Sequence, residues 1–504
     1  MRVMLTAKLK LLTTPAQAEQ LRRTALAYRD ALNHTSRIAF ANGKTSNKVA
    51  LQKLVYRDLR AQFSLSAQLA CNVPRQVAST YKGLWTKGMQ NSQHRANGQT
   101  KKRYKGLDQP PKYVSMTTTF NYGYDYRFKT GQQVSLTTLD GRLVLSFQGY
   151  TPHLEHIKAG RQFDEAQKAR KRKEHQAKQG TIMTSELSEE EEDVQHEQEL
   201  DRTMLTQLTL PGDAEPEDEA EPLAENRASA RTSEVNGLTF GAAKLWCDPR
   251  TKHWYLLVTL EIPCPEVTPA TCPKTQGIDL GQRYLAVSTT PDNDTQFISG
   301  GQAVHQGEAY QRVRTRLQKK GTRKATARLR QMTLRERRLK ANVNHVTAKA
   351  LVEPSTLIGL EDLSYIRERT KHKGKKQRRK ASKWAFAEMK GFVSYKALLA
   401  GSVAITVDAD YTSQQCPACT HRSKANRPDK GLLFRCSNPD CRFELHADLV
   451  GARQVCMRTL VVRHVWITTG ILSPSPDGTS GEAKAARLDS YAELRWRTAS
   501  SPAL

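Results

Sequence analysis

Residues 276 to 288 read QGIDLGQRYLAVS, an apolar strand that carries one acid, Asp279, followed by a turn and a second strand. A carboxylate inside a buried strand is costly unless a cation or hydrogen-bond donors compensate its charge. A bound metal ion would supply that compensation. A strand-end Asp that accepts backbone N–H groups is the alternative, and this segment alone does not separate the two.

Two further acids occupy comparable places downstream. Residues 355 to 363 read STLIGLEDL, an apolar strand that ends in Glu361 and Asp362, and strand ends are where an α/β sheet carries its catalytic groups. Residues 446 to 455 read HADLVGARQV, the start of a helix with Asp448 in its first turn, where an acid is also a common cap. Asp279, Glu361 and Asp448 are therefore the candidate catalytic residues.

Four of the nine cysteines fall in two pairs, Cys416 with Cys419 and Cys436 with Cys441. Two such knuckles can close a tetrahedral shell around zinc, and a shell made of four thiolates is a structural rather than a catalytic site. Free buried thiols would not explain the pairing, and the scattered positions of the other five cysteines favour zinc over disulfides. We predict that these four residues bind Zn²⁺.

In their order along the chain, these motifs resemble the TnpB (OrfB) proteins of bacterial insertion sequences and the related compact type V CRISPR effectors. The similar stretches are GIDLG around Asp279, GLEDL around Glu361, YTSQQCPAC at 411 to 419 and ADLVGA around Asp448. The resemblance covers about residues 275 to 460. Three departures stand out: Thr420 and Arg442 replace the usual glycines, the Asn of the D-x-N-A-A pattern is missing, and the chain has a long acidic insertion.

The resemblance implies an RNA-guided DNA endonuclease with an RNase H-like (RuvC-type) domain, whose three acids hold two Mg²⁺ ions. Carried over to this chain, those acids would be Asp279, Glu361 and Asp448. Carboxylates suit a hard ion such as Mg²⁺, and a pair of such ions can activate the attacking water and stabilise the leaving oxygen. The implied partners are a guide RNA and a DNA target, and the sequence leaves the oligomeric state open.

Two basic runs flank Glu361. Between Arg312 and Lys340 there are thirteen Lys or Arg in 29 residues, interleaved with apolar residues as in a helical arm. Between Arg367 and Lys383 there are ten, almost without apolar residues. A solvated face is the alternative, but phosphate contacts would use such charges. The candidates for backbone contact are Arg312, Arg316, Lys319, Arg323, Arg330, Lys375, Lys376, Arg378 and Arg379.

The overall charge points the same way. The chain carries +29, the acidic segment from Glu186 to Glu225 carries −15, and the rest therefore carries +44. Such an excess indicates a polyanionic partner. No apolar run approaches the roughly 18 to 20 residues that cross a bilayer, and no secretory signal is recognisable, so we predict a cytoplasmic protein without a membrane partner.

The expected architecture is a multi-domain α/β chain. Residues 1–12 and 107–264 should form a β-rich, barrel-like subdomain, interrupted by a helical subdomain at 13–106 and by a charged, mostly disordered insertion at 160–232. An RNase H-like mixed sheet should occupy 275–411 and 447–469, with a zinc ribbon at 412–446 and a loose tail at 470–504. Aromatic residues of the first half could stack on bases, although alternating aromatics in strands are more often core: Tyr104, Tyr113, Phe120, Tyr122 and Tyr124.

RNA-guided cleavage of DNA in a transposable element is the favoured function. A compact type V CRISPR effector would share this chemistry and differ in genomic setting. Two further candidates are a catalytically weak RNA-guided DNA-binding regulator and a conventional transposase, which joins strands as well as cutting them.

Overall fold

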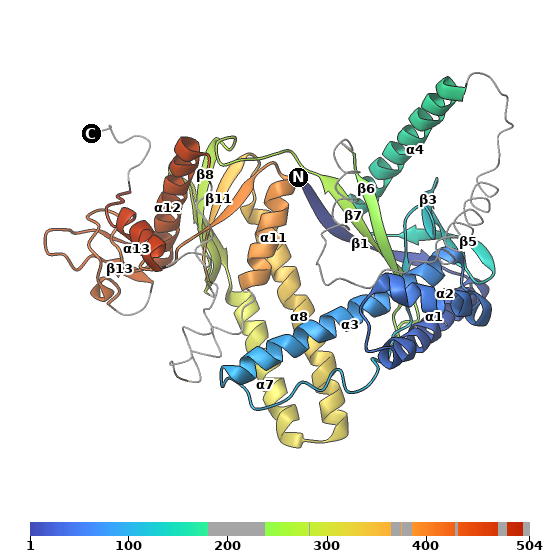
Figure 1. Ribbon diagram of the computed structural model, residues 1–504. Helices are drawn as coiled ribbons and strands as arrows, with labels where there is room; N and C mark the ends of the chain where they lie inside the picture. Colours follow the sequence, from blue (N-terminus) through green and yellow to red (C-terminus); the bar gives the residue numbers. More distant parts are fainter. Residues whose placement is uncertain are drawn as a thin grey trace. The chain divides into compact units, whose positions relative to one another are not determined.

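The computed structural model describes residues 1–179, 237–281, 283–363, 374, 386–428, 432–471 and 481–496. The chain divides into two compact units, one formed by Arg2–Pro263 and the other by Met1 together with the residues from Cys264 onward. Each unit combines helices with a β-sheet (Figure 1). The expected multi-domain α/β class is therefore confirmed. Within the described residues, no helix is both long enough and apolar enough to cross a membrane.

The first unit contains the elements of the N-terminal half. In chain order they are β1 (Arg2–Leu12), α1 (Pro15–Ala41), α2 (Lys48–Phe63), α3 (Ala67–Ala96), β2 (Thr117–Phe120), β3 (Tyr126–Lys129), β4 (Gln133–Thr138), β5 (Gly141–Gln148), α4 (Thr151–Gln179), β6 (Thr239–Cys247) and β7 (Trp254–Pro263). Helix α1 begins where Thr14 caps it, because the Thr14 side chain accepts from the Gln17 amide and Pro15 follows directly.

The sheet of this unit has the order β2-β6-β7-β1-β5-β4-β3 among the described residues, and neighbouring strands run antiparallel. The N-terminal strand β1 pairs with β7 from Arg2 opposite Pro263 to Lys10 opposite Tyr255. A tight turn at Asp140-Gly141 joins β4 to β5, and Gly141 there adopts φ of +97°, a conformation that favours glycine.

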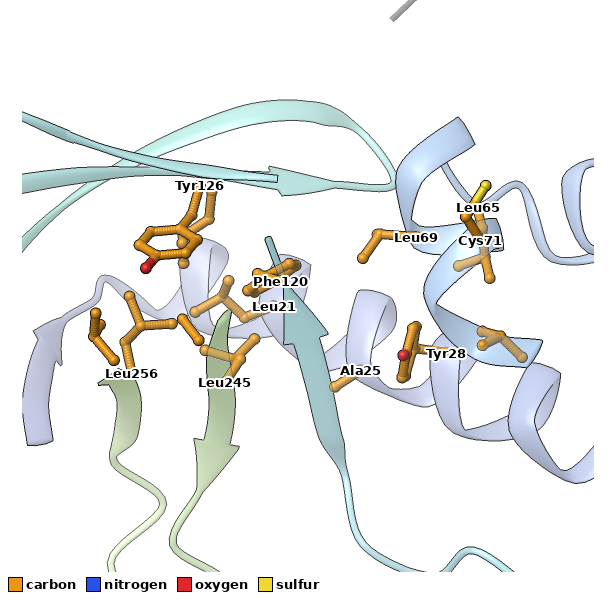
Figure 2. Close-up of a cluster of buried hydrophobic side chains, with 14 of the residues drawn as sticks. Leu21, Ala25, Tyr28, Leu65, Leu69, Cys71, Phe120, Tyr126, Leu245 and Leu256 are labelled. Carbon is orange, nitrogen blue, oxygen red and sulfur yellow. The ribbon is translucent and has the colours of Figure 1, made fainter. Parts of the chain in front are cut away.

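One hydrophobic core holds this unit together. Figure 2 shows side chains of α1, α3 and the sheet meeting in it, among them Leu21, Tyr28, Leu69, Phe120 and Leu245. The predicted helical and β-rich subdomains therefore share a core. Phe120 is fully buried, so its role is packing, whereas Tyr124 is 41% exposed.

The expected insertion at 160–232 begins inside a helix. Helix α4 runs from Thr151 to Gln179 and contains the basic first part of the insertion. Its start packs on the sheet through Ile157, which is buried. The prediction of disorder is wrong for residues 160–179, because the apolar positions of the first turns anchor the helix. The remainder, 180–232, lies outside the described residues.

The second unit is built around a mixed sheet. Its elements are β8 (Lys274–Asp279), β9 (Tyr284–Thr289), β10 (Thr295–Ser299), α7 (Gly301–Lys320), α8 (Arg323–Leu351), β11 (Thr356–Glu361), α11 (Phe386–Leu399), β12 (Val403–Val407), the 3-10 helix η1 (Lys424–Asn426), β13 (Leu433–Arg435), β14 (Glu444–His446), α12 (Ala447–Thr469) and α13 (Gly481–Ser490). The strand order is β10-β9-β8-β11-β12. Strands β8, β10, β11 and β12 run in one direction, and β9 runs antiparallel to its neighbours β8 and β10.

The alternation of side chains along β8 and β11 determines which face each acid meets. Ile278, Ile358 and Leu360 pack with α8 and α11 on one face. Residues one position away point to the other face, which α12 covers through Val455 and Val462. Asp279 and Glu361 therefore lie on the α12 face, at the ends of two adjacent parallel strands.

Two glycines let α12 approach the sheet closely. A Cβ on Gly277 would fall 2.2 Å from the Cys456 amide nitrogen, and a Cβ on Gly359 would fall 1.8 Å from the Thr459 hydroxyl oxygen. A side chain at Gly277 would push the helix away from the strands, because the atoms it would meet are backbone, whereas one at Gly359 would have to displace the Thr459 side chain. Each glycine stands two residues before an acid on the same strand face, so the close packing also brings α12 next to the two carboxylates.

The expected loose tail is wrong for residues 481–496. They form α13 and a following turn in which Tyr491 is only 2% exposed. Arg487 of α13 forms an ion pair with the buried Asp408 at 2.9 Å. The Ser, Pro and Ala content of the tail hid these anchoring residues, and residues 472–480 and 497–504 lie outside the described part of the chain.

Candidate active site and metal centre

The three predicted acids come from three different elements and lie near one edge of the mixed sheet, but within the described residues their carboxylate oxygens do not form a group compact enough to hold one metal ion. Asp279 is the last residue of β8, Glu361 the last of β11, and Asp448 lies in the first turn of α12. The carboxyl groups of Asp279 and Glu361 lie close enough for one of them, when protonated, to donate to the other. A Cβ on Gly451, one helical turn after Asp448, would fall 3.1 Å from the carboxyl carbon of Asp279. The N-terminal end of α12 thus lies directly against Asp279.

Electrostatics at this edge are those of crowded carboxyl groups. Burial, reinforced by the nearby Glu361 and Asp448 charges, raises the pKa of Asp279 well above its ordinary value. Burial also raises the pKa of Glu361, against the opposing effects of Thr412 and Arg458. Such a cluster opposes its own ionisation. A cation among the carboxylates would relieve both the desolvation and the repulsion.

Two arginines that the sequence did not single out act on these acids. The positive charge of Arg427, just after η1, favours the ionised form of Asp279. Arg458 of α12 is fully buried, donates to the backbone oxygens of Asp408 and Asp410, and its charge favours the ionised form of Glu361. For Arg458, the sequence offered one indication of such a role, because it is a charged residue on a largely apolar helix, ten positions after Asp448. For Arg427, it offered no indication.

Thr412 belongs to the stretch that carried the family resemblance. It is buried, and its hydroxyl lies within reach of both the Ala409 backbone oxygen, at 3.0 Å, and the Glu361 carboxylate. His446 caps α12 by accepting from the Asp448 amide at 3.3 Å. Thr412 precedes and His446 follows the cysteine-containing segment, residues 413 to 445. Each end of that segment therefore contacts one of the acids, Glu361 at one end and Asp448 at the other.

The four predicted zinc ligands come together. The Sγ atoms of Cys416 and Cys441 are 3.9 Å apart, and those of Cys419 and Cys436 are 3.5 Å apart. The four Sγ atoms all lie within 4.8 Å of one another, which is close enough for them to bind one ion together. Within the described residues, this is the one group of three or more His, Cys, Asp or Glu side chains that is so compact. The cluster could therefore bind zinc.

The surroundings of the cluster favour thiolates and fix both knuckles. Burial would raise the pKa of Cys419, but the His421 amide and the neighbouring thiols outweigh it and lower the pKa to about 7. Asn426, which is buried, accepts from the Ser437 amide at 2.7 Å, and Asn438 accepts from the Asp440 amide at 3.1 Å. These bonds accommodate the longer second knuckle.

Thr420, which replaces a usual family glycine, adopts φ of +66°. This left-handed conformation is uncommon outside glycine and is strained for a β-branched side chain. The replacement of glycine by Thr420 therefore falls at a position whose backbone conformation favours glycine. Arg442, the other replacement, does not have a positive φ among the described residues.

The first basic run forms the hairpin of α7 and α8, which Figure 1 shows as two long neighbouring helices. Glu336 holds the pair together, because Arg314 and Lys340 both contact its carboxylate. The predicted phosphate-contact residues of this hairpin are all exposed: Arg312, Arg316, Lys319, Arg323 and Arg330. The other four candidates, Lys375, Lys376, Arg378 and Arg379, lie outside the described residues.

Comparisons with known proteins agree with the sequence motifs. Residues 386–455 match the family model Cas12f1-like, TNB domain. A CRISPR-associated endodeoxyribonuclease Cas12f2 from a Micrarchaeota archaeon is 34% identical over 119 residues, which are 23% of this chain and 21% of the relative. A TnpB-like protein of Methanocaldococcus jannaschii is 31% identical over 120 residues, 23% of this chain and 41% of the relative.

A solved Cas12f1–sgRNA–target DNA complex aligns over 86% of this chain and 80% of its own chain, with 13% identity and a TM-score of 0.43. The two curated relatives named above are matched over less than half of their length. The domain match falls on the part of the chain that carries the cysteines and Asp448. The resemblance predicted from the motifs is confirmed: this chain is a relative of the TnpB-like and Cas12f proteins and carries a Cas12f1-like TNB domain.

Proposed function

We propose that this chain is an RNA-guided DNA endonuclease of the TnpB type that cleaves DNA by Mg²⁺-dependent phosphodiester hydrolysis. The single observation that carries the proposal is the partly buried Asp279, whose carboxyl group lies beside that of Glu361 and against the N-terminal end of α12, which carries Asp448. Such crowding of like charges costs stability. A cation bound between the carboxylates would offset this repulsion and stabilise the folded chain.

The residues fit the proposed metal. Asp279, Glu361 and Asp448 offer hard carboxylate oxygens, which suit Mg²⁺. When bound, such ions supply an activated water and charge stabilisation for the leaving oxygen. Arg427 is placed to meet negative charge next to Asp279, and Thr412 and Arg458 favour the ionised form of the Glu361 carboxylate. The mixed sheet, in which β9 alone of the five strands runs opposite to the others, supports an RNase H-like assignment of this unit.

For the cysteine cluster we propose a structural Zn²⁺ held by Cys416, Cys419, Cys436 and Cys441. The cluster lies between Thr412 and His446, both of which contact the acid site or its helix. A stable ribbon would therefore hold two ends of the site in register. All four positions of the shell are filled by protein, which leaves no open position for a reacting water.

We further propose that the exposed cations of the α7–α8 hairpin contact a nucleic-acid backbone. Between Gly301 and Leu351 the only acids are Glu308 and Glu336, and Glu336 is already paired. The face of the hairpin is thus strongly positive. Phosphate contacts of this kind give affinity without selecting a sequence.

The test is a cleavage assay on the whole chain copurified with its RNA. We expect a discrete RNA species, and cutting of a plasmid that carries the matching target when Mg²⁺ is present. The variant Asp279→Asn, which keeps the side-chain size, should bind the same target without cutting it. Random RNA fragments, or cleavage that survives Asp279→Asn, would overturn the proposal.

A compact type V CRISPR effector is a second candidate, and the CRISPR-associated names of the relatives favour it. It predicts the same cleavage chemistry, so the origin of the copurified RNA separates the two: a repeat-derived guide indicates CRISPR, and a guide from the element's own end indicates the TnpB type. Target binding without cutting by the unaltered chain would instead indicate a regulator, and RNA-independent strand joining would indicate a transposase.

A further inference from the structure

The C-terminal segment, residues 481–496, contacts the part of the mixed sheet that carries Glu361. Arg487 binds both oxygens of Asp408, at 2.9 and 3.3 Å, and Lys484 pairs with Asp410 at 2.8 Å. Asp408 directly follows β12, whose last residue Val407 stands opposite Glu361. The side chain of Asp408 is only 2% exposed, so this ion pair is buried and sits one residue from the strand end.

The same segment also holds the first cysteine knuckle. The Gln415 side-chain amide donates to the backbone oxygens of Tyr491 and Ala492, at 2.9 and 3.2 Å. Arg422 donates to the Leu488 oxygen at 3.0 Å, and the Trp496 amide donates to the Pro417 oxygen at 2.7 Å. These bonds tie the stretch from Gln415 to Arg422, which contains Cys416 and Cys419, to a segment far along the chain.

Arg458 connects these two sets of contacts. Its guanidinium donates to the oxygens of Asp408 and Asp410 on one side, and the ring of Tyr491 covers it at 4.8 Å on the other. A buried guanidinium needs such partners, since an uncompensated buried charge is costly. Tyr491 is itself buried. Without the C-terminal segment, Arg458 would lose its cover and Asp408 its ion pair.

We propose that residues 481–496 are a positioning element of the nuclease site: Arg487 and Tyr491 fix Asp408 and Arg458 beside Glu361, and the bonds to Gln415 and Pro417 fix the cysteine ribbon against the same edge. This inference rests on the proposed nuclease function for its catalytic consequence. The acids themselves come from β8, β11 and α12; the segment adds no ligand and acts through its neighbours. Groups that orient metal ligands in this way commonly change metal affinity or activity when they are altered.

The test compares Tyr491→Leu, which removes the ring face, with Tyr491→Phe, which keeps it, and with Glu482→Gln as a control at an exposed position of α13. We expect Tyr491→Leu to raise the Mg²⁺ concentration for half-maximal cleavage by about 10-fold or more. Tyr491→Phe and Glu482→Gln should stay close to the unaltered chain. A role in stability alone would lower the unfolding temperature without moving the Mg²⁺ dependence.

A second readout does not depend on cleavage. Amide hydrogen exchange of residues 408 to 422 should be faster in Tyr491→Leu than in Tyr491→Phe, because the segment that covers them is loosened. If Tyr491→Leu does not fold, Arg487→Lys takes its place, since it keeps the charge but not the two-atom contact with Asp408. The inference is wrong if these exchange rates and the Mg²⁺ dependence are unchanged in folded variants. If the unaltered chain does not cleave at all, the proposed function fails, and the exchange rates alone decide whether the segment positions this edge.

Discussion

The contact between α12 and the sheet can be tested at Gly277. A Cβ there would lie 2.2 Å from the Cys456 nitrogen, 2.5 Å from its Cα and 2.5 Å from the Ala452 oxygen, all of them backbone atoms. An ordinary contact needs about 3.5 Å, so Gly277→Ala must move the helix by roughly 1 Å. Overpacking of this kind costs typically about 1 to 3 kcal/mol, occasionally more. Because backbone cannot be trimmed, we expect a loss at the upper end of that range, about 3 kcal/mol.

Gly359→Ala provides the contrast, because its obstacle is a side chain. The nearest atoms are the Thr459 hydroxyl oxygen at 1.8 Å, its Cβ at 3.0 Å and its Cγ2 at 3.2 Å. Thr459→Ala removes two of these three atoms. The cost of Gly359→Ala should therefore fall by at least about 1 kcal/mol when it is made together with Thr459→Ala. Cys456→Ala should not relieve Gly277→Ala, since the atoms that clash remain.

The assay is hydrogen exchange of the amides in β8, β11 and α12, which reports the local free energy of opening and does not require the whole two-unit chain to unfold in one step. The reasoning is refuted if Gly277→Ala changes the opening free energy by less than about 0.5 kcal/mol, the size of an ordinary surface effect. It is equally refuted if Gly359→Ala costs the same in the unaltered chain as in the Thr459→Ala variant.

The remaining predictions concern charge, metal and backbone strain. The pKa of Asp279 is higher in the folded chain than in the unfolded chain, so the Mg²⁺-free chain binds more protons when it is folded. Its stability should therefore fall as pH rises through the folded pKa. Asp279→Asn should flatten this fall in a pH series of thermal unfolding, and an unchanged slope would contradict the prediction. Cys416→Ser should abolish a zinc content of one per chain, measured by elemental analysis, whereas Cys247→Ser, outside the cluster, should keep it; equal zinc in both would refute the site. Thr420→Gly should stabilise the ribbon by up to about 1 kcal/mol by removing positive-φ strain, while Gly at the exposed neighbour Ala418 should destabilise it; denaturation of the zinc-loaded chain distinguishes the two signs. Arg330→Gln should weaken nucleic-acid binding equally on all sequences and lower the slope of log affinity against log salt by about 1, whereas Arg314→Gln should chiefly lower stability through Glu336; an unchanged salt slope for Arg330→Gln would argue for a solvated face.

The sequence was sufficient to predict that Asp279 and Glu361 end two strands and that four cysteines form one cluster. Asp279 and Glu361 each end an apolar strand, and parallel neighbours place such ends at one edge. The cysteine spacing indicated a common site without any knowledge of the fold. In both cases the informative pattern is local: a period of two along a strand, or a pair of thiols within a few residues.

What the sequence did not reveal depends on contacts between distant segments. Arg427 and Arg458 look like ordinary basic residues until η1 and α12 bring them to the acids. Tyr491 and Trp496 stand in a region whose composition resembles a loose tail, and only their contacts with Arg458 and Pro417 show that they are anchored. The helical and β-rich parts of the first half likewise looked separable, because a shared core leaves no mark at the boundary between two patterns.

These observations suggest why the site needs so much support. Crowded carboxylates repel one another whenever the ions are absent, so the elements that carry them must be held by interactions that do not involve the acids. Gly277 and Gly359 supply one such interaction by letting α12 pack against bare backbone, and the buried Arg458 with its partners supplies another on the Glu361 side. If both were redundant with metal binding, variants at either place would regain normal exchange rates in saturating Mg²⁺. If they set the geometry in advance, as the packing indicates, Mg²⁺ will not restore them, because an ion can draw carboxylates together only as far as the helix and strands allow.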